Sequence, residues 1–133
     1  MFGFKPFTIP YQEDFVRGIN TPFNFYGTSL KSVFTLSKER GYTFIGCNSA
    51  GNNAYFIKDQ YFENLSMSAP TLEEGFEFAS FSEVWDENRN ALRGEQKIKS
   101  LQGLEVYNTE TKQIEHINSE EIIKELKAAN KLM

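Results

Sequence analysis

Residues 29–58 read SLKSVFTLSKERGYTFIGCNSAGNNAYFIK, and this stretch has the clearest secondary-structure signals in the chain. In residues 29–40, apolar side chains recur at positions i, i+3 and i+4, the spacing of one buried helical stripe. Thr28 or Ser29 can cap this helix, because a side-chain hydroxyl accepts a hydrogen bond from an otherwise unpaired backbone amide. Gly41 supplies the left-handed residue that commonly follows a helix. The sequence therefore predicts a helix over residues 29–40.

Two short apolar runs, Tyr42–Cys47 and Ala54–Lys58, follow the helix and flank the polar segment Asn48–Asn53. Aromatic and β-branched residues favour strands, and a loop rich in asparagine and glycine favours a tight reversal, so these segments predict a β-hairpin. Nearly every residue of both strands is apolar, which predicts that both faces of the hairpin are covered. Since a two-stranded hairpin alone is only marginally stable in water, we expect more sheet beside it.

The remaining segments have weaker signals. Residues 1–27 contain three of the four prolines and many aromatic side chains, and this hydrophobicity predicts an irregular but packed segment rather than a disordered one. Thr71 and Glu74 have the spacing of a capping box and predict a short helix. Further along, the pattern predicts a helix, a hairpin and a final helix: residues 94–101, residues 104–107 with 113–117, and residues from about Ser119.

The composition predicts one compact domain. The 133 residues suffice for a single core, and the aromatic side chains concentrate in residues 1–62, whereas acidic residues are in excess in residues 63–133. The net charge is −4. A negative chain without a basic face is not expected to bind nucleic acid, because binding to the phosphate backbone needs clustered lysine and arginine.

Three sequence features bear on localisation. No apolar run approaches the roughly 20 residues that a membrane-spanning helix needs, so we expect no membrane association. The first ten residues lack the apolar core of a secretory signal. The single cysteine cannot form an internal disulfide, which fits a reducing compartment. We therefore expect a cytoplasmic protein.

The residue types of the usual catalytic and metal sites are scarce. His116 is the only histidine and Cys47 the only cysteine, so a structural zinc site is not expected. We interpret His116 as an exposed strand residue and Cys47 as a buried, inert thiol. The glycine-rich motifs that cradle phosphate groups are absent from the sequence. No catalytic residue and no metal ligand is assigned.

The remaining polar candidates are hydroxyl and amide groups in an aromatic setting. Aromatic walls with a few placed polar atoms are typical of small-molecule pockets. The alternative interpretation is that the tyrosines belong to the core and that the asparagines only form turns, because asparagine and glycine favour turns for local reasons. The candidates are Tyr11, Tyr26, Ser29, Asn48, Asn52 and Asn53.

Four segments resemble, in order and spacing, the C-terminal half of bacterial FkbM-type, S-adenosylmethionine-dependent methyltransferase-like proteins, which are often found among surface-polysaccharide genes. The resemblance extends from about Phe2 to Ile117. The middle block, GY with GCNSAGNNAYF, is the most specific. The four segments are FTIPY (7–11), YGTSL (26–30), GY (41–42) with GCNSAGNNAYF (46–56), and LEVYN (104–108).

The resemblance implies a Rossmann-like methyltransferase fold, a mostly parallel sheet of seven strands whose last two strands form an antiparallel hairpin. Residues 29–40 then resemble the helix before the sixth strand, and the predicted hairpin resembles strands six and seven. The expected fold class is α/β: a partial Rossmann-like methyltransferase unit, made of a helix and an antiparallel β-hairpin, with a small α+β C-terminal extension. We divide the chain into a methyltransferase-like segment, 1–64, and an acidic extension, 65–133, within one compact domain.

The resemblance also implies a substrate site. It places Tyr11, Tyr26, Gly27 and Ser29 in the loop that follows strand five. The Asn48–Asn53 loop starts at the same end of the sheet, where open α/β sheets bind ligands. A sugar-derived small molecule is the ligand that the resemblance implies. The expected substrate-binding residues are Tyr11, Tyr26, Gly27, Ser29, Asn48, Asn52 and Asn53.

The family holds S-adenosylmethionine with an acidic, glycine-rich loop after the first strand and an acidic residue after the second. Both lie upstream of the region that resembles this chain. The resemblance therefore assigns no cofactor-binding residue here, and we expect this chain alone to bind no cofactor. The cofactor half is expected to be missing or to be supplied by a partner chain.

Two functions remain open from the sequence. The first is the C-terminal portion of a methyltransferase-like protein of surface glycan metabolism, not catalytic by itself. The second is a non-enzymatic, stand-alone module that binds a small ligand or a protein. We also expect a homo-oligomer, because Ala54–Lys58 or Tyr42–Cys47 would present an unpaired strand edge without proline or internal charge, and symmetric dimers are the commonest way to close such an edge.

Overall fold

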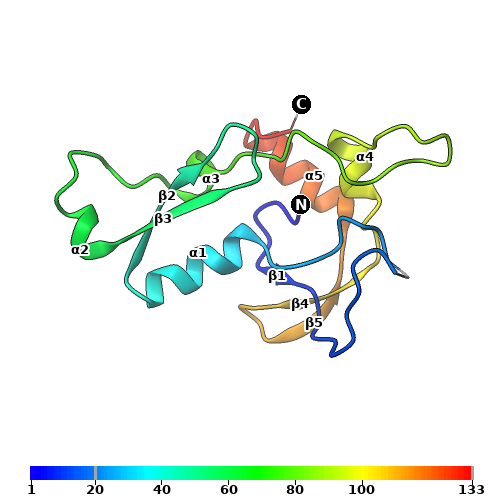
Figure 1. Ribbon diagram of the computed structural model, residues 1–133, viewed down its shortest axis with the longest axis horizontal. Helices are drawn as coiled ribbons and strands as arrows, with labels where there is room; N and C mark the ends of the chain where they lie inside the picture. The colour runs from blue at the N-terminus through cyan, green and yellow to red at the C-terminus, as the bar shows by residue number, and fades with distance from the viewer. Residues whose placement is uncertain (20, 133) are drawn as a thin grey trace.

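The computed structural model describes residues 1–19 and 21–132 of the protein. These residues form a mixed α/β fold with two antiparallel sheets, one of order β1-β4-β5 and one made of β2 and β3 (Figure 1). In chain order the elements are β1 (Phe7–Thr8), α1 (Leu30–Glu39), β2 (Tyr42–Cys47), β3 (Ala54–Lys58), α2 (Asp59–Phe62), α3 (Leu72–Gly75), α4 (Gly94–Lys99), β4 (Glu105–Asn108), β5 (Gln113–His116) and α5 (Ser119–Ala128).

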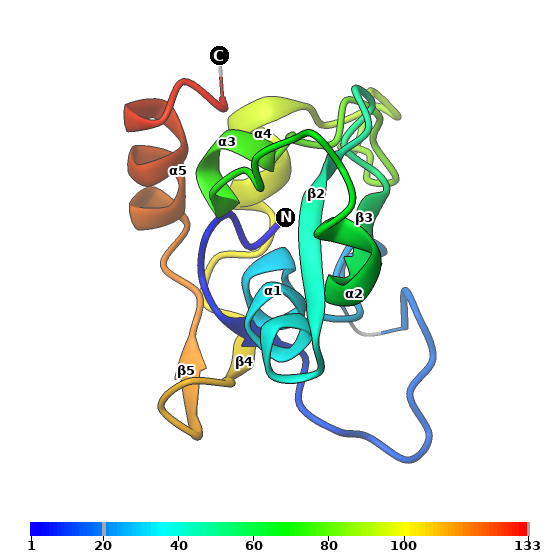
Figure 2. The same ribbon diagram turned by 90° about the vertical axis from the view of Figure 1, so that its left-hand side faces the viewer.

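Helix α1 begins and ends one residue inside the predicted range 29–40, with Ser29 and Arg40 as its caps. The Ser29 hydroxyl accepts a hydrogen bond from the Ser32 amide at 3.1 Å, which satisfies one of the unpaired donors at the start of the helix. At the other end, Gly41 has a φ of 74°, a left-handed conformation that suits glycine. The helix contacts both β1 and β2, so it lies between the two sheets (Figure 2).

The hairpin β2–β3 also forms where the sequence predicts it, with Phe44 opposite Phe56 and a register shift between Phe44 and Gly46. The prediction of further strands beside it is wrong for the described residues, because β2 and β3 pair only with each other. Helices supply the cover instead. Phe34 of α1 packs edge-on against Phe44 at 5.7 Å between ring centroids, and Gly75 of α3 lies against the same ring.

The prediction that both faces of the hairpin are covered is only partly right. Phe44 is buried, but Tyr55 on β3 remains 50% exposed and Tyr42 on β2 is also exposed. An apolar sequence pattern reports which side chains prefer burial, and it does not specify whether a strand, a helix or a further molecule covers them.

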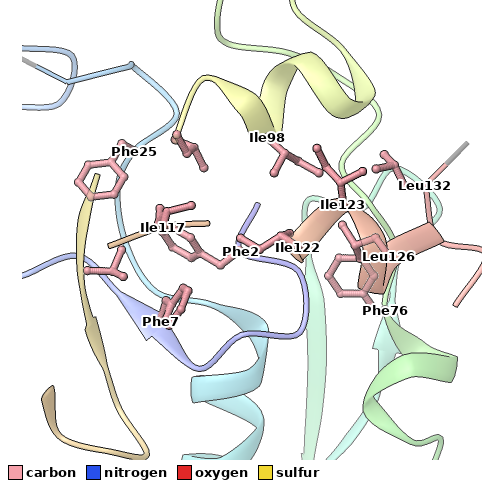
Figure 3. Packing of buried hydrophobic residues seen from close by; sticks show 12 residues of the cluster. Phe2, Phe7, Phe25, Phe76, Ile98, Ile117, Ile122, Ile123, Leu126 and Leu132 are labelled. Carbon is pink, nitrogen blue, oxygen red and sulfur yellow. The ribbon is translucent and has the colours of Figure 1, made fainter. Parts of the chain in front are cut away.

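The main core lies around α4, α5 and the three-stranded sheet (Figure 3). Phe2 makes edge-to-face contacts with the rings of Phe7 and Phe25, so the two ends of the segment 1–27 contribute to this core as predicted. The middle of the segment does not, because Val16 and Ile19 are exposed. The core therefore joins both ends of the chain. Its members are Phe2, Phe7, Phe25, Phe76, Ile98, Leu101, Val106, Ile117, Ile122, Ile123, Leu126 and Leu132.

Strand β1 was not expected from the sequence. It contains two residues, and it pairs with β4 so that Phe7 lies opposite Asn108. On its other side the chain returns at residues 27–29: the Ile9 amide donates to the Gly27 carbonyl at 3.1 Å, and the Ser29 amide donates to the Phe7 carbonyl at 2.7 Å. This pairing fixes the segment that leads into α1.

No helix in the described parts of the chain is long and apolar enough to cross a membrane.

Candidate functional site

A cleft of about 260 Å³ opens where the N-terminal residues, the start of α1 and the loop after β2 meet. Thr28 and Ser29 line one side, Asn52 and Asn53 line another, and Phe76 belongs to a third. A second hollow of about 260 Å³ adjoins it and shares Thr28 and Asn52 in its lining. We refer to the two together as the asparagine-loop cleft. It brings together the two segments that the sequence singles out, residues 26–29 and 48–53.

Asn48 builds the loop rather than facing a ligand. Its side-chain oxygen accepts hydrogen bonds from the backbone amides of Asn52 and Asn53, each at 3.1 Å. Its side-chain nitrogen donates to Asn52 Oδ1 at 2.7 Å. The turn interpretation of this residue is therefore sufficient, since an asparagine side chain commonly replaces a backbone acceptor in a turn. Asn52 and Asn53 are left on the cleft side of the loop.

The tip of the loop is fixed to the segment that precedes the exposed turn of residues 85–91. Gly51 has a φ of 68°, and a Cβ atom on it would lie 2.6 Å from the Phe78 carbonyl carbon. The Ser80 amide donates to the Ala50 carbonyl at 3.0 Å. Only glycine combines this left-handed backbone with so close an approach of another backbone segment. These contacts fix the position of Asn52 in the wall of the cleft.

Ser29 and Gly27 support the opposite wall. Ser29 is 4% exposed, and its hydroxyl accepts from the Phe7 amide and the Ser32 amide, each at 3.1 Å. The Gly27 carbonyl accepts from the Thr8 hydroxyl at 3.1 Å. These contacts are structural. Thr28, between them, is exposed and lines both hollows, although it is not among the predicted site residues.

Tyr26 belongs to a charged cluster at one end of the cleft. The Arg17 guanidinium lies 3.7 Å from the centre of the Tyr26 ring and 4.1 Å from that of Phe23, and it forms an ion pair with Glu83. The Tyr26 hydroxyl donates to Glu83 at 3.3 Å. Partial burial, together with the nearby Glu83 charge, raises the pKa of Tyr26 above its ordinary value. The hydroxyl therefore stays protonated at neutral pH and donates this hydrogen bond.

Lys97 and Asn24 form the inner wall, and neither was predicted. Lys97 is 4% exposed, and its ammonium group donates to the carbonyls of Ala79 at 3.0 Å and Phe81 at 2.8 Å. Burial lowers the pKa of Lys97. Asn24 is 2% exposed; its Nδ2 donates to the Lys97 carbonyl at 3.3 Å, and its Oδ1 has no hydrogen-bond partner among the described residues. Such an orphan acceptor is uncommon in protein interiors.

The other sequence candidates lie elsewhere or match their expected environment. Tyr11 is 91% exposed and does not line the cleft, so the structure does not place it with the other predicted substrate-binding residues. His116 is exposed on β5, as predicted. Cys47 is half-buried rather than buried, and it lines the cleft. In the described parts of the chain, no three histidine, cysteine, aspartate or glutamate side chains are arranged to hold a metal ion.

The fold bears on where a methyl-donor cofactor would bind. Every pair of neighbouring strands in residues 1–19 and 21–132 is antiparallel, so these residues contain no parallel strand–helix–strand unit. The glycine-rich cofactor loop of a Rossmann-like fold follows a strand of such a unit. The described residues therefore contain no such loop position, and we assign none of them to a cofactor.

A second cleft, of about 550 Å³, lies beside the hairpin and is lined by Phe34, Tyr42, Phe44 and Leu72 among others. None of the predicted site residues lines it.

Comparisons of the chain with protein-family models, with curated proteins and with solved structures found no match. We take the asparagine-loop cleft as the candidate site, because predicted site residues line it and none of them lines the cleft beside the hairpin.

Proposed function

We propose that this chain is the C-terminal, substrate-binding portion of a methyltransferase-like protein of surface glycan metabolism, with α1 and the β2–β3 hairpin as the last helix and strands of a Rossmann-like unit. One observation carries the proposal. The segments YGTSL and GCNSAGNNAYF, on which the family resemblance rests, meet at one cleft, with Thr28 and Ser29 on one side and Asn52 and Asn53 on the other.

The chemistry of the cleft suits a small, sugar-derived ligand. The amide of Asn53 has a side-chain oxygen with no partner among the described residues, and the same is true of Asn52 Nδ2. Amide and hydroxyl groups both donate and accept, so they match the hydroxyl groups of a sugar. Thr28 adds a hydroxyl group, and the largely buried Phe76 adds a small apolar part of the lining.

We assign no methyl transfer to these residues alone. The cofactor would be held by residues outside this chain of 133 residues, on another segment or on a partner chain. Groups of this chain would then bind and orient the acceptor, and the Tyr26 hydroxyl, paired with Glu83, stays protonated at neutral pH.

The test is ligand-detected NMR of the chain with a panel of methyl glycosides, followed by amide shift mapping. We expect saturation transfer to at least one glycoside and shifts confined to residues 26–29 and 51–54. Asn53→Ala should weaken binding, since its side chain lines the cleft and makes only one long hydrogen bond within the loop, to Asn52 Oδ1 at 3.4 Å. Asn64→Ala is the matched control, because Asn64 is exposed and bonds only the nearby Gln60 carbonyl. Equal binding by the two variants would contradict the proposal.

The alternative is a non-enzymatic binding module, and the exposed apolar side chains around β3 and α2 favour it: Tyr55, Tyr61, Leu65 and Met67. Calorimetry with S-adenosylmethionine tests whether this chain holds the cofactor by itself. Binding of the cofactor by this chain would contradict the assignment of the cofactor site to other residues.

A further inference from the structure

The outer edge of β3 is free in the described residues. On one side, β3 pairs with β2 along its whole length: Lys58 lies opposite Tyr42, and Ala54 lies opposite Cys47. On the other side, no strand is paired with it, and no other segment of residues 1–19 and 21–132 makes a backbone hydrogen bond to residues 54–58. In Figure 2, β3 lies on the side of β2 that faces away from α5 and from the three-stranded sheet. A row of backbone donors and acceptors therefore faces solvent.

This edge lacks the features that usually prevent strands from pairing between molecules. Proline, internal charge and a covering helix or loop are the common protections. The strand reads AYFIK, so it has no proline, and its only charge is at the last residue, Lys58. Ala54 and Tyr55 are exposed. Helix α1 packs against β2 through Phe34 and Phe44, and no other segment of the described residues makes a backbone hydrogen bond to the outer edge of β3.

We propose that two copies of this chain pair antiparallel along β3, with Phe56 at the two-fold axis, to make a four-stranded sheet of order β2-β3-β3-β2. This register is the one that pairs all five residues of the strand. It sets Tyr55 of each copy opposite Ile57 of the other, on the same face of the sheet. Aromatic side chains opposite β-branched ones are favourable cross-strand pairs.

The charges of the strand fit the same register. Lys58 of each copy lies opposite Ala54 of the other, so the two lysines stand at opposite ends of the paired segment. Four residues of extended strand separate them by roughly 13 Å, which exceeds the screening length of about 8 Å at physiological salt. Like charges are therefore not brought together.

A five-residue strand pair is smaller than a standard protein interface, which buries about 1,200–2,000 Å². We therefore expect a weak dimer in equilibrium with monomer. Sedimentation equilibrium over a roughly 100-fold range of protein concentration should show the apparent mass rising from 15.3 kDa toward twice that value. A mass of 15.3 kDa at every concentration would overturn the proposal.

Disulfide trapping tests the register. In a Cys47→Ser background, one protein carries Tyr55→Cys and another carries Ile57→Cys. Directly opposite residues have Cα atoms about 4.5–5.5 Å apart, within the range for a disulfide. In a dimer of two identical variants, the Cα atoms of the two cysteines are about 8 Å apart, because the two cysteine positions are offset by two residues along the strands.

We expect a covalent dimer, on mild oxidation, in the mixture of the two variants and little in either variant alone. Equal cross-linking in all three samples, or none in any, would overturn the pairing along β3. The two-dimensional amide spectrum of each variant shows whether it remains folded. This inference does not depend on the proposed ligand, so sugar binding and dimer formation succeed or fail separately.

Discussion

Gly51 packs directly on the backbone of Ala79: a Cβ atom added to Gly51 would lie 2.7 Å from the Ala79 amide nitrogen. The contact joins the loop after β2 to the segment that Lys97 holds by its hydrogen bonds to Ala79 and Phe81. The position of Asn52 in the cleft therefore depends on Lys97, which is 45 positions further along the chain.

Gly51→Ala should destabilise the protein by about 2–4 kcal/mol, since it combines an unfavourable left-handed backbone with a clash that backbone atoms cannot relieve. Gly103→Ala is the matched control, because Gly103 has a φ of 76° and no atom within 4 Å of the added methyl group. It should cost about 1–2 kcal/mol. Urea unfolding measures both, and equal losses would mean that the contact with residues 77–79 is unimportant.

Asn48→Ala should loosen the loop, because two backbone amides lose their acceptor; we expect a loss of about 1–2 kcal/mol. The local readout is faster hydrogen exchange at the amides of Asn52 and Asn53. Asn48→Asp keeps an oxygen in the same position, so exchange at these amides should stay slow. If Ala and Asp accelerated exchange equally, the Asn48 oxygen would not be what orders the loop.

Ser29→Ala should cost about 1–3 kcal/mol, because it removes the cap of α1 and also leaves the Phe7 amide without its side-chain acceptor. Thr71→Ala provides the comparison. Thr71 caps the short, exposed α3 through the same type of bond to the Glu74 amide, and we expect it to cost less. Thermal unfolding ranks the two, and a larger effect at Thr71 would contradict the role given to Ser29.

Lys97 should leave a signature in the pH dependence of stability. Burial lowers its pKa in the folded protein below the ordinary 10.5, so the unfolded chain binds more protons between the two values. The free energy of unfolding should therefore rise with pH across that window, relative to a Lys97→Met variant.

The comparison with Lys97→Met removes the titration of the tyrosines, including Tyr26, whose raised pKa acts in the opposite direction at alkaline pH. Urea unfolding at a series of pH values from neutral to about 10.5 gives the difference between the two proteins. A difference that stays constant over this range would show that Lys97 titrates alike in the folded and unfolded chains.

The elements that the sequence predicts well carry their signals locally. The Ser29 cap, the stripe of α1 and the Gly41 terminus lie within 13 residues, and the Thr71–Glu74 capping box is present in the structure as predicted. Turn chemistry at Asn48 is local in the same way, since both of its backbone partners are within five residues.

The features that the sequence does not reveal depend on distant partners. Strand β1 exists because Phe7 meets Asn108, and the inner wall of the cleft exists because Asn24 meets Lys97. Lys97 sits in an ordinary lysine-containing helix, and nothing in its neighbours marks it as buried. Tyr11 is predicted to bind substrate through the family resemblance, but the structure leaves it 91% exposed and outside the lining of the cleft.

The pairing of Phe7 with Asn108 has a consequence for how the protein is made. During synthesis, the N-terminal phenylalanines emerge long before β4 and α5, which supply much of the core around Phe2 and Phe7. Folds dominated by such distant contacts form slowly, and their apolar segments stay exposed until the last partner arrives. On the ribosome, the nascent chain is therefore expected to remain open to chaperones and proteases until α5 has been translated.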